Sequence, residues 1–132
     1  MGQDQKLKLP TLNPQTVSAI KGTPYPQPFN TGASEIREKK VIGDPLGLNR
    51  FGVNLVHLPD GAWSAMRHWH ANEDEFVYIV EGVVTLITND GEQLLNPGDV
   101  AGFPAASEDG HQLVNASGKP AIYLEVGSRL GI

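Results

Sequence analysis

Turn signals recur at intervals of roughly ten residues from residue 34 onward, and this spacing is what most constrains the fold. The clearest are residues 59–61 (Pro-Asp-Gly), 89–91 (Asn-Asp-Gly) and 96–99 (Asn-Pro-Gly-Asp). Glycine supplies positive φ at low steric cost, and proline, asparagine and aspartate favour tight turns beside it. The stretches between the signals are short and rich in alternating or β-branched apolar residues, as strands are. The sequence therefore predicts an all-β sandwich or barrel.

The chain is expected to divide into a Pro-rich N-terminal arm, residues 1–33, and a β-barrel domain, residues 34–132. Within the arm, residues 14–21 are expected to form one or two helical turns with Asn13 as N-cap. The arm anchors on its own barrel, anchors on a second subunit, or is a loosely attached tail. No helix is expected after it. The expected strands are residues 35–42, 51–58, 64–70, 75–80, 83–88, 92–95, 100–103, 111–115 and 121–126.

Composition excludes several classes of function. A hydrophobic content of 39% and a charged content of 19% suit one packed domain. The net charge of -5 leaves no basic footprint for nucleic acid or for a membrane surface. The absence of cysteine excludes disulfides, thiolate metal sites and a Cys nucleophile. Because the sequence shows neither a signal-peptide core nor an apolar run of roughly 20 residues, a soluble cytoplasmic protein is expected.

The stretch richest in candidate functional residues runs from residue 61 to residue 82. His68 and His70 are one residue apart, so in an extended strand their imidazoles point to the same face. Glu75 has the wrong parity for that strand, and a turn at residues 71–74 is needed to bring its carboxylate back beside the imidazoles. Two histidines and a carboxylate that meet at one point predict a metal site.

The same stretch resembles the first motif of the cupin family, Gly-x5-His-x-His-x3-4-Glu-x6-Gly. The match is complete from His68 to Gly82, and Gly61 precedes His68 by one residue more than the pattern asks. A second cupin motif, Gly-x5-Pro-x-Gly-x2-His-x3-Asn, follows in the right order. The chain therefore resembles a small single-domain cupin.

The second motif is matched at both ends but not in its middle. Residues 98–104 and 111–115 fit, whereas Ala106 stands where glycine is expected and the spacing between the two halves is longer by two residues. The extra length predicts a loop at residues 105–110. This loop either caps the mouth of the barrel or is a solvated surface loop.

The resemblance implies a jelly-roll barrel with a metal ion in its mouth, held by His68, His70, Glu75 and His111. Three imidazoles and one carboxylate suit a divalent transition metal, which is Fe, Mn, Ni, Zn, Co or Cu, and do not choose among these. Four protein ligands leave coordination positions open for water or for a small-molecule ligand.

Neighbouring titratable side chains have other expected roles. His57 lies outside both motifs and is a structural residue, a cavity-lining residue or a partner of a metal ligand. Glu73 and Asp74 are expected in solvent at the turn, and either replaces Glu75 only if the register slips. Strand parity places no Arg or Lys inside the barrel, which counts against a sugar phosphate as substrate.

Two functions are compatible with such a site. One is an enzyme that binds or transforms a small oxygenated molecule by dioxygenase- or isomerase-type chemistry. The alternative is a non-catalytic barrel that binds or senses a small molecule. A homodimer is expected in either case, because jelly-roll sheets expose edge strands that an arm from a second copy can cover.

Overall fold

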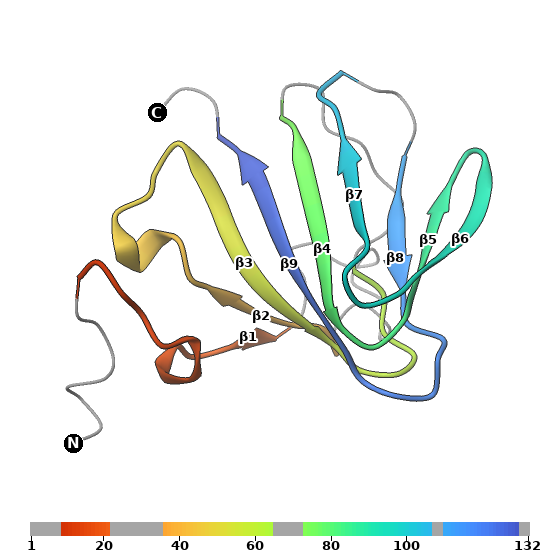
Figure 1. Ribbon diagram of the computed structural model, residues 1–132, viewed down its shortest axis with the longest axis horizontal. Coiled ribbons are helices and arrows are strands. Elements are labelled where there is room, and N and C mark those ends of the chain that lie inside the picture. Colours follow the sequence, from red (N-terminus) through yellow and green to blue (C-terminus); the bar gives the residue numbers. More distant parts are fainter. Residues whose placement is uncertain (1–8, 22–35, 65–72, 107–109, 130–132) are drawn as a thin grey trace.

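The computed structural model describes residues 9–21, 36–64, 73–106 and 110–129, which form two antiparallel sheets (Figure 1). The larger sheet has six strands in the order β1-β2-β3-β9-β4-β7, and the smaller has three in the order β6-β5-β8. The strands are β1 (Ile20–Lys21), β2 (Glu38–Val41), β3 (Phe51–Leu58), β4 (Glu75–Glu81), β5 (Val84–Thr88), β6 (Gly91–Leu95), β7 (Val100–Phe103), β8 (Gln112–Val114) and β9 (Ala121–Ser128).

The prediction of an all-β fold is confirmed, and the strands lie close to their expected positions. The strand expected at residues 64–70 falls almost wholly outside the described residues. Just before it, Trp63 forms an antiparallel bridge with Val114 of β8, and the Ser64 N–H donates to Leu113 O at 2.8 Å. No helix among the described residues is long and apolar enough to cross a membrane.

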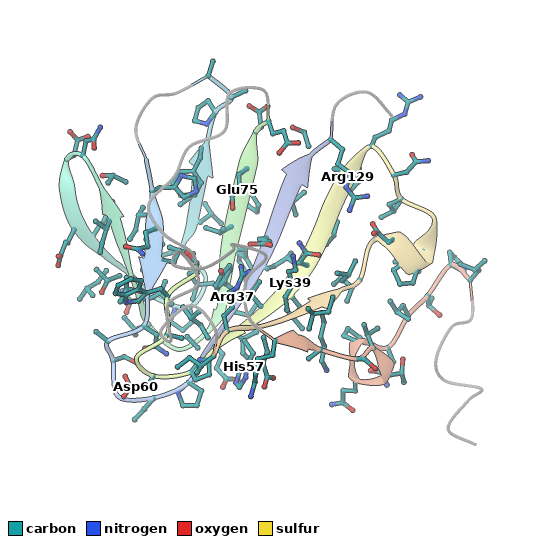
Figure 2. The ribbon with its side chains drawn as sticks, turned by 180° about the vertical axis from the view of Figure 1, so that it is seen from behind. Arg37, Lys39, His57, Asp60, Glu75 and Arg129 are labelled. Atoms are coloured by element: carbon teal, nitrogen blue, oxygen red, sulfur yellow. The ribbon has the colours of Figure 1, made fainter. Side chains whose placement is uncertain are left out.

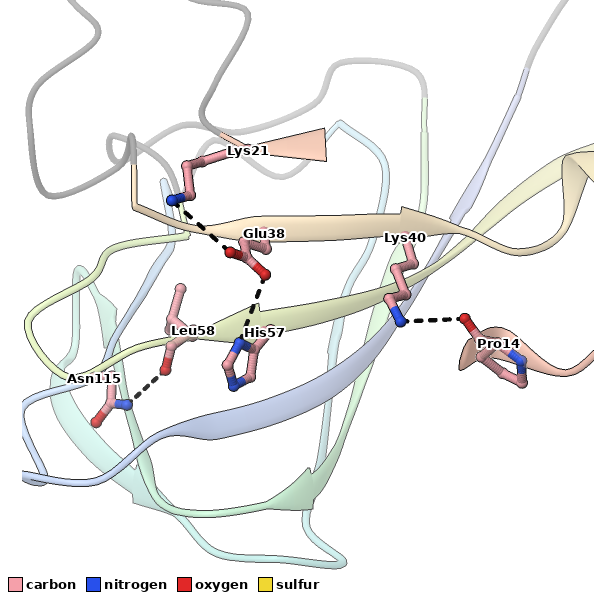
Figure 3. A network of polar contacts seen from close by, with 7 residues as sticks. All are labelled: Pro14, Lys21, Glu38, Lys40, His57, Leu58 and Asn115. Carbon is pink, nitrogen blue, oxygen red and sulfur yellow. Dashed lines mark hydrogen bonds and ion pairs between the residues drawn. The ribbon is translucent and has the colours of Figure 1, made fainter. Parts of the chain in front are cut away.

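The described part of the N-terminal arm lies on its own barrel. The expected helix is wrong beyond its first turn, which is the 3-10 helix η2 (Pro14–Thr16) with the Asn13 side chain as its cap. The chain then extends into β1, which pairs with β2. Lys40 Nζ donates to Pro14 O at 3.2 Å (Figure 3). The boundary expected at residue 33 falls outside the described residues, so the division into arm and barrel stays a prediction.

Alternation along β4 separates the core from the surface. Val77 and Ile79 are 1% and 0% exposed, whereas Phe76, Tyr78 and Val80 are 41%, 40% and 47% exposed. Burying a Val or Ile side chain contributes about 1.5–3 kcal/mol, so a slip of one residue would be costly. The core draws on both sheets and consists of Val56, Leu58, Ala62, Val77, Ile79, Val84, Leu86, Leu95, Leu113, Ala121 and Tyr123.

Asn115 stabilises one end of the barrel, where β8 leads into β9. Its side chain is fully buried, and Nδ2 donates to Leu58 O and Lys119 O, both at 2.7 Å (Figure 3). Its Oδ1 accepts hydrogen bonds from the Ser117 N–H at 3.0 Å and from Ser117 Oγ at 2.7 Å. A buried amide with its donors and acceptor satisfied is a scaffold element. The last residue of the second motif therefore holds the fold.

Gly82, the last residue of the first motif, lies at the same end. Its φ is +79°, and a Cβ there would lie 2.5 Å from Pro120 O and 2.8 Å from Ala121 Cα. Both neighbours are backbone atoms and cannot swing aside. Glycine is therefore required by the backbone conformation and by the close approach of the turn before β9.

Gly82→Ala is expected to lower the free energy of unfolding by about 3 kcal/mol or more, because it combines backbone strain with a backbone clash. Gly98→Ala is the matched control, since Gly98 also has a positive φ, +93°, but has no heavy atom within 4 Å of the added carbon. The control should cost about 1 kcal/mol. Urea unfolding of both variants measures the difference, and equal losses would contradict the close approach.

Candidate metal centre

Glu75 and His111 meet inside the barrel from opposite sheets. Glu75 begins β4, and His111 immediately precedes β8. His111 Nε2 and Glu75 Oε1 are hydrogen-bonded at 2.9 Å, and the two side chains are only 5% and 18% exposed. Figure 2 shows Glu75 near one end of its strand. Because Gly82 follows the other end of β4, this contact lies at the end of the barrel away from Asn115.

Phe103 fixes the plane of the His111 ring. The two rings stack with centroids 3.7 Å apart and an interplanar angle of 2°. Phe103 is also directly opposite Glu75 in the β4–β7 pairing. The carboxylate, the phenyl ring and the imidazole therefore form one packed unit, in which the phenyl ring covers one face of the imidazole against water.

Asp74 has a structural role beside this unit. Its Oδ1 accepts a hydrogen bond from the Ala105 N–H at 2.7 Å, and its backbone bonds Ser128 in both directions, at 2.9 and 3.0 Å. These contacts tie the start of β4 to the loop after β7 and to the end of β9. They keep β4 in register, so Glu75 supplies the carboxylate at His111 and Asp74 does not replace it.

Two of the four expected ligands are thus brought together, and the other two, His68 and His70, lie outside the described residues. Among the residues that the structure describes, no group of three or more His, Cys, Asp or Glu side chains is placed to hold a metal. The described pair nevertheless fits one ion. Two adjacent ligand atoms of an octahedral ion, with bonds of about 2.1 Å, are separated by about 3.0 Å.

His57 is not part of this site. It is an outward-facing residue of β3, and its Nδ1 lies 3.9 Å from Glu38 Oε1 on β2 (Figure 3). His57 and Glu38 line an outer groove of about 240 Å³, together with Leu55 and Ile122. The hypotheses that His57 lines the inner cavity or supports a metal ligand are therefore wrong.

The expectation that no Arg or Lys faces the interior is also wrong. Lys39 is directly opposite Val56, which is fully buried, and opposite residues in an antiparallel pair share a face. Arg37, two residues earlier, is on the same face and is 8% exposed (Figure 2). Sequence alternation could not find them, because outward-facing Glu38 and Lys40 make both faces of β2 charged.

A second carboxylate, Glu125, lies on the same inner face. It is opposite Asn54 on β3 and opposite the core residue Val77 on β4. Asn54 Nδ2 donates to Glu125 Oε2 at 2.9 Å. The sequence could have predicted that Glu125 points inward, because it continues the alternation of Ala121 and Tyr123 along the last strand.

Tyr123 lies among these charged groups. Burial raises the pKa of its phenol well above the ordinary value of 10.0; Glu125 and Glu75 add to the rise, and Arg37 opposes it. The hydroxyl forms no hydrogen bond of regular geometry with the described residues. At neutral pH the phenol therefore keeps its proton and can donate it to a bound molecule.

Ala106 occupies the position where the second motif has glycine, and the structure gives the reason for that preference. Its φ is +67°, in the left-handed region. An L-residue pays about 1–2 kcal/mol for this conformation. The longer loop thus keeps the left-handed turn of the motif, with local strain at Ala106. Residues 107–109 lie outside the described part, so the role of loop 105–110 stays a prediction.

A protein-family model for the cupin domain matches residues 54–127, more than half of the chain, and this span includes Glu75 and His111. The chain belongs to the cupin family. No curated protein matches this cupin in sequence.

Solved structures agree with the assignment. One named a sugar phosphate isomerase from a cupin superfamily, from Silicibacter pomeroyi, is 43% identical; the match covers 91% of this cupin and 76% of that chain, with a TM-score of 0.87. Another, from Acidithiobacillus ferrooxidans and provisionally named a sugar phosphate isomerase, is 32% identical, covering 91% and 75%, with a TM-score of 0.76. The polyketide cyclase RemF from Streptomyces resistomycificus, at 22% identity, 92% and 80% coverage and a TM-score of 0.74, shares the fold.

The raised pKa of Tyr123 predicts a loss of stability in alkali. Above about pH 10 the unfolded chain loses the phenol proton while the folded chain keeps it. The free energy of unfolding should therefore fall by up to about 1.4 kcal/mol per pH unit, and be unaffected by this group at lower pH. Urea unfolding between about pH 8 and pH 11 tests this. Tyr123→Phe should remove the slope, and Tyr78→Phe, at an exposed tyrosine, should retain it.

Proposed function

We propose that this cupin is a metal-dependent isomerase that acts on a small hydroxy-carbonyl compound. A divalent transition metal would be held by His68, His70, Glu75 and His111. The observation that carries the proposal is the buried Glu75–His111 pair at 2.9 Å, which has the separation of two adjacent ligands of one ion. Bound there, the metal would supply a Lewis acid that polarises the carbonyl and hydroxyl oxygens of the substrate.

The protein's own side chains would orient the substrate. Phe103 holds the His111 ring in one orientation and excludes water from one of its faces. Tyr123 keeps its proton at neutral pH and can donate a hydrogen bond to a substrate oxygen. These groups orient the substrate, and orientation by fixed groups lowers the barrier of the chemical step.

Glu125 is the proposed proton carrier. Isomerisation removes a proton from the carbon beside the carbonyl and returns one to the former carbonyl carbon, while a hydroxyl proton moves to the other oxygen. No oxidant or second substrate is needed. Glu125 faces the interior, is held by Asn54, and is not in the expected ligand set, so its carboxylate is free of the metal to accept and return the proton.

The interior charges and the named relatives favour isomerisation over dioxygenase chemistry. The inward-facing Arg37 and Lys39 remove the earlier objection to a phosphorylated substrate. The two relatives of 32% and 43% identity are named as sugar phosphate isomerases. The alternative is a barrel that only binds or senses its ligand, and the experiment below distinguishes it from an enzyme.

His111→Ala should lose bound metal, with an affinity at least about tenfold weaker, and should lose turnover with it. Glu125→Gln should retain the metal and lose about a hundredfold or more in turnover, because only the proton transfer is removed. Elemental analysis measures the metal, and NMR of sugar phosphates follows the conversion of aldose and ketose forms.

His57→Ala is the matched control, since this histidine lies on the outer face and should change neither property. Stoichiometric metal in the His111→Ala protein would remove His111 from the ligand set. Oxygen uptake without isomerisation would identify a dioxygenase, and stabilisation by a ligand that is never converted would identify a binding barrel.

A homodimer is also proposed, through the outer face of the larger sheet. The exposed apolar residues Phe76, Tyr78 and Val80 of β4 lie on that face, with Val100 of β7 beside them. Contiguous exposed apolar surface on a domain commonly marks an interaction site, and in a twofold dimer the same face of each copy would form the interface.

Tyr78→Glu is expected to convert the dimer to a monomer, because it would bury a charge at the centre of the interface. Light scattering coupled to size exclusion measures the mass. Leu94→Glu is the control, since Leu94 is at least as exposed but belongs to β6 of the smaller sheet. A monomeric unmodified chain, or a dimer that tolerates Tyr78→Glu, would contradict this interface.

A further inference from the structure

Cationic side chains share the inner face of the larger sheet with Tyr123. Val56 of β3 lies opposite both Lys39 and Tyr123, so these two residues are at one level of that face. Arg37, two residues before Lys39, is 8% exposed, so its charge is largely removed from water. It also opposes the rise in the pKa of the Tyr123 phenol. A buried guanidinium is costly to maintain, so its position calls for a reason beyond solubility.

Lys39 stands beside it on the same face. The described residues include no ion-pair partner for Lys39, whereas Lys21 and Arg129 each have a described carboxylate within 4.0 Å. The neighbouring Lys40 points to the opposite face and bonds Pro14 O. Lys39 therefore places a positive charge on the interior face. No described carboxylate forms an ion pair with it.

The charges on the described inner face balance only in the absence of a metal. Arg37 and Lys39 contribute two positive charges, and Glu75 and Glu125 contribute two negative charges. A divalent ion with neutral imidazole ligands would leave two positive charges in a site of low dielectric. A ligand that carries two negative charges compensates for them.

We propose that Arg37, Lys39 and the Tyr123 hydroxyl form an anion subsite that binds the phosphate group of the substrate. This inference deepens the proposed function and rests on it for a metal centre in the same interior. The subsite would hold the phosphate on the β2–β9 side of the interior, while the hydroxy-carbonyl end faces Glu75 and His111.

The donor groups match a phosphate better than a carboxylate. A guanidinium offers two parallel N–H groups, an ammonium offers three rotatable donors, and the phenol offers one O–H. A phosphate monoester carries close to two negative charges at neutral pH and three terminal oxygens. A carboxylate carries one charge and two oxygens, and would leave both charge and donors unsatisfied.

Binding of inorganic phosphate to the full-length protein tests the subsite, measured by titration calorimetry on the metal-loaded and the metal-free form. Lys39→Gln and Arg37→Gln are each expected to weaken phosphate binding by about tenfold to a hundredfold, the usual effect of losing a charge-assisted hydrogen bond. Metal content should not change in either variant. Lys40→Gln is the matched control, because it removes the same charge from the other face of β2 and should bind phosphate as the unmodified protein does.

Equal phosphate affinity in Lys39→Gln and Lys40→Gln would overturn the subsite, and so would acetate that binds more tightly than phosphate. Lys39 is only partly buried, so its variant serves as the test even if the Arg37 variant is unstable. Failure of the metal centre has a different signature: no bound metal, with the order of phosphate affinities among the variants retained. Bound metal with no difference among the variants overturns the subsite alone.

Discussion

The contact between Glu75 and His111 is the interaction on which one end of this barrel depends. It is a buried polar pair that joins the two sheets, and such a pair is tolerated only where geometry and hydrogen bonding are good. Phe103 supplies the geometry by stacking on the imidazole, and Asp74 supplies the register by tying the start of β4 to its neighbours. These contacts support one another, so the fold and the site are stabilised by the same side chains.

The two cupin motifs each contribute to both ends of the barrel. The first motif supplies Glu75 at one end of β4 and Gly82 at the other, where no side chain fits beside the turn before β9. The second supplies His111 at the start of β8 and Asn115 just after its end, where the amide fastens that turn. Motif residues that flank a short strand on both sides thus fix its length and position, which sets where the inward-facing side chains can meet.

The sequence predicted the fold well where the two faces of a strand differ in polarity. In β4 the buried Val77 and Ile79 alternate with Tyr78 and its neighbours, and apart from Ala106 the described residues with positive φ are glycines. Prediction failed in β2, where charged side chains occupy both faces, so parity could not say which of them point inward. In the arm the cap at Asn13 and one helical turn are confirmed, but the helix ends at Thr16 and does not continue to residue 21.

The charged interior is where local sequence rules and the native structure disagree most, and the disagreement has a physical meaning. Arg37, Lys39 and Glu125 lie on a face whose other members form the hydrophobic core, and apolar residues there would be more stable. Natural proteins depart from the pattern of apolar interiors chiefly where function requires it. Tyr123 belongs to both regions, since its ring packs in the core and its hydroxyl faces the charges. Core residues and functional candidates therefore share the inner face of one sheet, from the level of Glu75 to the level of Tyr123 and Lys39.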